Sequence, residues 1–208
     1  MLKRVVLYNG ESTYRIKVGD IVRELPIVQV DEGLWIASDA DLVLGDIEFI
    51  SHAAELISRK VGHLDPEVVV APEAKALPLA FQVAKNLGHN RMVFARKSIK
   101  AYMSDYLLVE AKSITTSEKQ TLVLTRGDAE YLKGKRVCLL DDVVSTGGTL
   151  KALESVTNKA GGRIVCKASI WIEGPWYEDD LTFLGELPVF VNEEKLKELK
   201  ATLCRIRK

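Results

Sequence analysis

Residues 137–150, with the sequence VCLLDDVVSTGGTL, narrow the possible folds more than any other segment of this 208-residue chain. The run VCLL is typical of a buried strand, Asp141 and Asp142 follow at its end, and a helix is expected to begin near Thr149. Gly147 and Gly148 permit a tight turn in between. A strand, a Gly-rich turn and a helix in this order predict an α/β fold with a parallel sheet. Ligands bind such sheets at the carboxyl ends of the strands, where this turn lies.

The rest of the chain alternates in the same way from residue 46 onward. Helices are expected at 46–60, 77–87, 149–159 and 192–200. Strands are expected at 67–71, 91–95, 121–125, 136–140 and 163–172, and short extended pieces at 5–8, 14–18, 26–30 and 34–37. Residues 98–120 are polar and lack a clean period, so we expect an irregular stretch there. No linker divides the chain, which predicts one domain over residues 1–208, with helices on both faces of the sheet.

The turn after residue 144 has the chemistry of a phosphate site. Backbone N–H groups and a helix N-terminus favour an anion, and Ser145, Thr146 and Thr149 add hydroxyl donors. Asp141 and Asp142 would repel that phosphate, so they suit neutral hydroxyls or a metal ion instead. A ligand with a phosphate at one end and a diol about one sugar away can bind both the turn and the two acids. This points to a ribose 5-phosphate. The segment has neither the GK[ST] of a P-loop nor a GxGxxG fingerprint.

Charge and cysteine content exclude several other classes of protein. Lys plus Arg and Asp plus Glu both number 29, which argues against nucleic-acid binding and against a membrane-surface role, since both need a basic field. No apolar run approaches the roughly 20 residues that span a bilayer, and the N-terminus turns polar too soon for a signal peptide. The cysteines, Cys138, Cys166 and Cys204, lie far apart and are expected to be buried, reduced thiols. A cytoplasmic protein is therefore predicted.

The segment from Val137 resembles the 5-phosphoribosyl-1-pyrophosphate (PRPP) motif of type I phosphoribosyltransferases. The match consists of four apolar residues, two acids, two variable residues and a small residue before TGGT. The resemblance covers about residues 46–175 and is closest to the adenine branch. It implies a type I phosphoribosyltransferase-like parallel sheet, with a PRPP-binding core at 46–172 and a small hood from residues 1–44 and about 173–208. It also implies that the 5-phosphate is bound by Ser145, Thr146, Gly147, Gly148 and Thr149.

Two further segments resemble the pyrophosphate-binding parts of the family. PEAKA at residues 72–76 stands where adenine enzymes carry E-A-R-G, so Lys75 keeps the charge of the Arg but loses its bidentate fork. ARKSIK at residues 95–100 resembles the R-K-x-x-K segment. Because these cations follow predicted strand ends, we expect them on the same rim as Asp141. The resemblance implies a pyrophosphate-binding set of Glu73, Ala74, Lys75, Arg96, Lys97 and Lys100.

The resemblance implies transfer of phosphoribosyl from PRPP to a purine base, with adenine favoured, giving a nucleoside monophosphate and pyrophosphate in purine salvage. Mg²⁺ would enter with PRPP, near Asp141 and Asp142, which would act as the catalytic pair. Residues 101–120 stand where the family has a mobile loop that excludes water. Adenine enzymes carry Glu-Tyr-Gly in that loop, whereas here Thr115 stands about where the Glu would be. Glu110 or Glu118 could take its place, and the sequence does not decide between them.

The base pocket is expected near the end of the strand at 163–172 and under the hood around residues 23–35. The stretch WIEGPW, residues 171–176, carries aromatic rings that could stack on a purine and an acid that could read its edge. Ordinary packing explains the three tryptophans equally well. The residues that we predict to bind the base are Val143, Ile172, Glu173 and Trp176.

Three alternatives share this motif. A regulatory protein could sense PRPP without catalysis, although a winged helix is not expected from the strand-like first 44 residues. A phosphoribosyltransferase could act on xanthine, hypoxanthine or a pyrimidine. A PRPP synthetase-like protein would need a nucleotide site and a longer chain. The family resemblance also predicts a homodimer.

Overall fold

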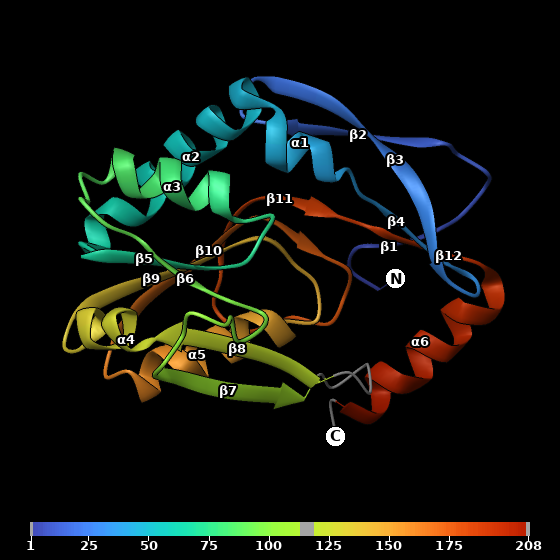
Figure 1. Cartoon of the computed structure of the whole chain (residues 1–208). Helices are drawn as coiled ribbons and strands as arrows, with labels where there is room; N and C mark the ends of the chain where they lie inside the picture. Colours follow the sequence, from blue (N-terminus) through green and yellow to red (C-terminus); the bar gives the residue numbers. More distant parts are fainter. Residues whose placement is uncertain (1, 113–118, 207–208) are drawn as a thin grey trace.

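A computed structural model describes residues 2–112 and 119–206 of the chain (Figure 1). Its centre is a five-stranded sheet in the order β11-β10-β9-β5-β6, and all four neighbouring pairs are parallel. The strands are β5 (Val68–Pro72), β6 (Val93–Ala95), β9 (Arg136–Val144), β10 (Arg163–Glu173) and β11 (Thr182–Leu187). The predicted α/β fold with a parallel sheet is confirmed.

Helices cover both faces of this sheet because its strands are apolar on both sides. In β5, Val69 and Ala71 pack toward α2 (Ile47–Val61) and α3 (Leu77–Asn86), while Val68 and Val70 pack toward α5 (Gly148–Lys159). Successive side chains of a strand point to opposite faces, so an unbroken apolar run needs a cover on each side. Figure 1 shows α2 and α3 on one side of the sheet and α5 on the other.

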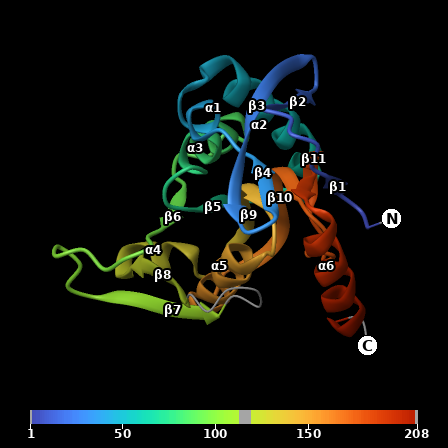
Figure 2. The same ribbon diagram turned by 90° about the vertical axis from the view of Figure 1, so that its right-hand side faces the viewer.

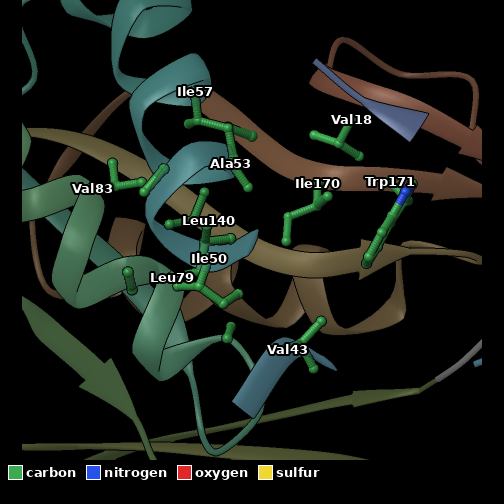
Figure 3. Close-up of a cluster of buried hydrophobic side chains, with 14 of the residues drawn as sticks. Val18, Val43, Ile50, Ala53, Ile57, Leu79, Val83, Leu140, Ile170 and Trp171 are labelled. Atoms are coloured by element: carbon green, nitrogen blue, oxygen red, sulfur yellow. The ribbon is translucent and has the colours of Figure 1, made fainter. Parts of the chain in front are cut away.

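Helix α2 provides most of the cover on its face. Asp46 caps it, because its carboxylate accepts a hydrogen bond from the Phe49 backbone N–H at 2.9 Å. Phe49 is fully buried and its ring stacks on Trp171 with centroids 5.5 Å apart. Figure 3 shows the adjoining cluster, in which Ile50, Ala53 and Ile57 face the sheet. The short helix α1 (Ala40–Gly45), which was not predicted, precedes α2 and spans too few residues to have a recognisable period.

A second sheet forms the hood beside the central sheet. Its order is β1-β12-β4-β3-β2, with β1 parallel to β12 and the other pairs antiparallel. Arg23 ties it to the central unit through Asp46 and Glu48, each at 2.7 Å. The elements are β1 (Val5–Leu7), β2 (Thr13–Val18), β3 (Ile21–Asp31), β4 (Leu34–Ala37), β12 (Val189–Val191) and the following helix α6 (Glu193–Ile206). Within the predicted hood segment 173–208, β11 instead extends the central sheet by pairing with β10.

The expectation of an irregular stretch at 98–120 was wrong for residues 106–112 and 119–120, which are strands, whereas the predicted strand at 121–125 is confirmed. β7 (Tyr106–Lys112) and β8 (Lys119–Thr125) form an antiparallel hairpin, which Figure 2 shows projecting from the body. Leu122 and Leu124 are buried in the cluster beneath α5, and Leu107 and Val109 of β7 pack against the same cluster, so tertiary packing stabilises both strands. The helix α4 (Arg126–Leu132), also not predicted, follows directly. Thr115 and Glu118, and with them the proposed loop element, lie outside the described residues.

Two smaller expectations are also tested. Cys138 and Cys166 are buried free thiols, as expected, but Cys204 is exposed on α6, because it lies on the outer side of an amphipathic helix. Among the described residues, no helix combines the length and apolar character needed to cross a membrane.

The central packing gives a direct stability test. Phe49→Ala should lower the free energy of unfolding by about 3–5 kcal/mol, the usual cost of emptying a buried aromatic site. Phe81→Ala on α3 is the matched control, because Phe81 is 64% exposed, and it should change stability by less than about 0.5 kcal/mol. Urea denaturation of both variants measures the difference, and equal losses would contradict the assigned core.

Candidate active site

The turn between β9 and α5 encloses a small cavity, which we call the turn cavity. Gly147 is the N-cap of α5 and adopts φ +77°, a left-handed conformation that favours glycine. The Gly148 N–H donates to Thr146 Oγ1 at 3.4 Å. The cavity has a volume of about 180 Å³ and is lined by Asp141, Val143, Val144, Ser145, Thr146, Gly147, Gly148, Thr149 and Leu150. The five predicted phosphate-binding residues therefore surround one space at a helix N-terminus.

The two acids lie inside β9 rather than beyond it. The prediction had the strand end at Leu140, but β9 continues to Val144, because its pairing with β10 runs on to Val144 and Ile172. Adjacent strand residues point to opposite faces. Asp141 therefore lines the turn cavity, while Asp142 lines a second cavity on the other side. Both side chains are buried, and the Asp142 N–H donates to Asp141 Oδ1 at 3.0 Å.

The second space, which we call the inner cavity, lies between the central sheet and the hood. Its volume is about 210 Å³. It shares Val143 and Ser145 with the turn cavity, so the two cavities meet at the end of β9. Apolar and polar side chains contribute to its walls in nearly equal number. The lining residues are Leu25, Ile36, Ala37, Ser38, Asp39, Val43, Lys75, Asp142, Val143, Ser145, Trp171, Glu173 and Leu187.

The predicted base-binding residues divide between this cavity and the core. Val143 and Glu173 line the inner cavity. Ile172 packs in the cluster on the α5 face, and Trp176 packs against the hood cluster that contains Val5. Trp171, within the predicted WIEGPW stretch, lines the cavity instead. No local signal marked Ser38, Asp39 or Val43, because only the folded hood brings that segment to the cavity.

The two cation-bearing loops are tied together by Glu73. Its carboxylate accepts from Arg96 Nη1 at 3.1 Å and from the Lys97 backbone N–H at 3.3 Å. The Arg96 guanidinium also lies over the rings of Phe94 and Tyr102, at 4.6 and 5.5 Å from their centroids. Arg96 is thus held in place by its neighbours, and Glu73 joins the loop after β5 to the loop after β6. The peptide bond between Glu73 and Ala74 is cis.

The lysines of these loops differ in position. Lys75 lines the inner cavity, and its charge acts on Glu173. The charge of Lys97 acts on Asp141. Among the described residues, Lys100 is half-buried and lines neither cavity. Two of the four predicted cations therefore face the acids, a third is paired with Glu73, and the fourth stands apart.

Burial controls the electrostatics of the acids. Burial, and then the charge of Asp142, raise the pKa of Asp141 well above its usual range, while Lys97 opposes the shift. Burial also raises the pKa of Glu173, and the hydroxyl of Ser145 and the charge of Lys75 partly offset it. The site therefore concentrates carboxyl groups in a poorly solvated space, an arrangement that a bound cation or a neutral hydrogen-bonding ligand would stabilise.

The shape of the turn depends on the absence of a Cβ at position 147. A Cβ there would overlap the buried ring of Tyr177, whereas Gly88, which has the same φ of +77°, has no atom within 4 Å of that position. Gly147→Ala should therefore destabilise the protein by at least about 1 kcal/mol more than Gly88→Ala, because overpacking adds to the shared backbone strain. Denaturant unfolding of both variants checks this, and equal losses would mean that Tyr177 moves aside without cost.

The raised pKa of Glu173 makes stability depend on pH. The folded protein keeps this proton above the ordinary value of 4.5, where the unfolded chain releases it, so stability is lost as pH rises through the folded pKa. Glu173→Gln cannot lose that proton. The melting temperature of the variant minus that of the wild type should therefore increase between about pH 4 and about pH 8. A difference that stays constant or shrinks over this range would contradict the assigned burial.

Comparison with known proteins places these features in a family. The chain matches the phosphoribosyl transferase domain family over residues 45–175. It is 32% identical over 151 residues to the adenine phosphoribosyltransferase of Thermosipho africanus, covering 69% of this chain and 80% of that protein. The fold resembles that of adenine phosphoribosyltransferase from Rhodothermus marinus, with a TM-score of 0.60 at 20% identity over 84% of this chain and 94% of the other.

A third similar structure is adenine phosphoribosyltransferase from Trypanosoma brucei in complex with AMP, pyrophosphate and ribose-5-phosphate. Its TM-score is 0.55 at 18% identity, over 71% of this chain and 68% of the other. The family match spans the loops after β5 and β6, both acids and the turn before α5. With its parallel sheet, its hood and the turn cavity at the end of β9, the chain belongs to the phosphoribosyl transferase domain family.

Proposed function

We propose that this protein is a purine phosphoribosyltransferase that transfers the phosphoribosyl group of PRPP to a purine base, with adenine favoured. The main support for this proposal is that the turn cavity and the inner cavity meet at Val143 and Ser145. Asp141 lines the turn cavity and Asp142 lines the inner cavity. A nucleotide with its phosphate in the first cavity and its base in the second has its ribose over the two acids. The names of the bacterial relatives and the ligands of the Trypanosoma brucei enzyme support the same reading.

The turn cavity is the proposed site of the 5-phosphate. Ser145, Thr146, Gly147, Gly148 and Thr149 surround it, and the N-terminus of α5 adds the partial positive charge of its backbone N–H groups. Gly147 lets the backbone turn beside Tyr177. The donors of this site are uncharged. In the proposed arrangement the buried carboxyl group of Asp141, which also lines the turn cavity, contacts the sugar and not the phosphate.

Asp141 and Asp142 are the proposed catalytic pair. They would accept hydrogen bonds from the ribose hydroxyls and stabilise the positive charge that develops on the sugar as the bond to pyrophosphate breaks. The crowding of buried carboxyl groups here also fits a nearby cation, because a positive charge offsets their mutual repulsion. Mg²⁺ entering with PRPP would lie near Asp141 and Asp142, where it would supply positive charge to neutralise the leaving group.

The proposed pyrophosphate site is the pair of loops that Glu73 joins. Lys75 lies at the inner cavity and Lys97 acts on Asp141, so both can approach a pyrophosphate bound beside the acids. Arg96, held by Glu73, and Lys100, further along the loop, complete the set, and Ala74 contributes backbone at the loop itself. Loss of a highly charged leaving group requires cations of this kind.

The inner cavity is the proposed base site. Val143, Trp171 and Leu25 supply apolar walls for a planar ring, and Glu173 supplies a polar group. Ile172 and Trp176 then support the site from the core and the hood without lining the cavity. We also propose that the whole chain acts as a single domain, that the protein is cytoplasmic, and that it forms a homodimer.

The reaction is tested by incubating the protein with Mg²⁺, PRPP and each of adenine, hypoxanthine, guanine, xanthine and uracil. Pyrophosphate and nucleotide should appear together, with the highest kcat/KM for adenine. Asp141→Asn combined with Asp142→Asn should lower kcat by at least about 100-fold, because both groups act on the developing charge. Glu55→Gln, on the exposed side of α2, is the control and should leave kcat unchanged.

The outcomes separate the alternatives. PRPP binding without turnover of any base would support a PRPP-sensing protein instead. A higher kcat/KM for hypoxanthine, xanthine or uracil would assign another base. Unchanged turnover in the double variant would refute the assignment of the acids.

A further inference from the structure

Glu173 is the last residue of β10, and its side chain lines the inner cavity with only 8% of the residue exposed. The hydroxyl of Ser145 lines the same cavity and lowers the pKa of its carboxyl group. A carboxyl group has about four acceptor positions, so the neighbouring hydroxyl leaves most of this hydrogen-bonding capacity open to a ligand. Buried carboxyl groups in cavities of this kind are expensive to maintain, which calls for a functional reason.

Transfer to a nitrogen base requires a proton acceptor in the cavity that holds the base. A neutral purine carries a proton on its imidazole ring, and a bond from a ring nitrogen to C1 of the sugar forces that proton to leave. The hood and the central sheet both contribute apolar walls to the inner cavity, and Glu173 is buried there, which limits the access of water to the reacting nitrogen. The proton is then best accepted by a side chain of the cavity itself.

The other titratable groups of the inner cavity have different tasks. Asp39 caps α1, and its Oδ1 accepts from the Asp41 N–H at 2.9 Å. Asp142 also lines the inner cavity, but as one of the proposed catalytic pair it is assigned to the ribose hydroxyls. Lys75 is a cation whose charge acts on Glu173, and it lies on the loop proposed for pyrophosphate. Glu173 is the remaining titratable group of the inner cavity, and its carboxylate can accept the proton.

We propose, on the basis of the function proposed above, that Glu173 is the general base for the accepting nitrogen and the general acid for the reverse reaction. In the forward direction a ring nitrogen forms the bond to C1, the bond from C1 to the pyrophosphate oxygen breaks with its electron pair leaving on pyrophosphate, and the ring N–H proton passes to the Glu173 carboxylate. In the reverse direction the Glu173 carboxylic acid returns that proton to the base as the bond between the base and C1 breaks.

The surroundings of Glu173 suit this role. Burial raises its pKa and so strengthens it as a base, and the charge of Asp142 acts in the same direction. Lys75 and the Ser145 hydroxyl act in the opposite direction, and the carboxylate of Asp39 lines the same cavity. On the neighbouring strand, Glu186 is paired with Arg4 at 3.0 Å, and Arg4 Nε donates to the Gly174 carbonyl at 2.6 Å, so these two charges offset each other near Glu173.

The test is Glu173→Gln in the full chain, assayed in both directions with Mg²⁺. Forward turnover uses PRPP and adenine, and reverse turnover uses AMP and pyrophosphate. The variant should lose about 100-fold or more in kcat in both directions, the usual contribution of a positioned acid or base. Its affinity for AMP, measured by calorimetry without turnover, should stay within about threefold of the wild type, since the amide keeps the shape of the acid.

The pH dependence supplies a readout that a structural role would not change. The wild-type forward kcat should rise with pH as Glu173 loses its proton, and the reverse kcat should fall over the same range, because the two directions need opposite forms. Both slopes should disappear in Glu173→Gln. Glu186→Gln, which removes a 54% exposed acid on the adjoining strand, is the matched control and should keep both slopes and kcat within about twofold.

Each other outcome overturns the inference in a distinct way. Wild-type kcat in Glu173→Gln would exclude a proton-transfer role. A loss of AMP affinity with kcat unchanged would make Glu173 a binding residue only. Absence of wild-type turnover with every base, together with intact AMP binding, would reject the proposed enzyme itself and the inference with it.

Discussion

The structure is organised by one strand, β9, which is buried on both faces and paired on both sides. Because Val137 and Leu139 face α5 while Cys138 and Leu140 face α2 and α3, neither side can be left in water, and helices must cover both. The same alternation continues into the two acids. It sends Asp141 to one cavity and Asp142 to the other. The functional geometry is thus an extension of the core packing by two residues.

The parts that could be predicted from sequence are those that depend on local pattern. The strand, acids, turn and helix of residues 137–160 are continuous in the chain, and their apolar periods and glycines are visible without a structure. The loop residues Lys75 and Lys97 follow strands and were predicted near the acids for that reason. The walls of the inner cavity could not be found in this way. Leu25, Asp39 and Leu187 come from distant segments that meet only after the hood has paired with itself.

One strand was missed. β7 has the largely apolar sequence YLLVEAK, but the polar residues on either side of it hide the pattern. Its partner was predicted, because the strand at 121–125 carries the apolar Leu122 and Leu124, which are buried under α5. The sequence placed Arg96 among the cations for pyrophosphate by its resemblance to the R-K-x-x-K segment, but it could not show that Glu73, Phe94 and Tyr102 hold the side chain in place. The charge of a side chain in the sequence indicates which ligands it can bind. Only the folded structure shows whether that charge is already paired with a neighbouring residue. The burial of Asp141 and Asp142 side by side lowers the stability of the folded protein, a loss that is common where buried groups serve a function.

The hood is closed by the two ends of the chain. β1 pairs with β12 in parallel, β4 pairs with β12 on its other edge, and Arg4 reaches the carbonyl of Gly174. During synthesis, the strand, turn and helix of the turn cavity leave the ribosome well before β12 does. All the residues that line the turn cavity are also made before Glu173 and Leu187, so the walls of the inner cavity are completed later than those of the turn cavity. The order of synthesis thus separates two cavities that share Val143 and Ser145 in the folded protein.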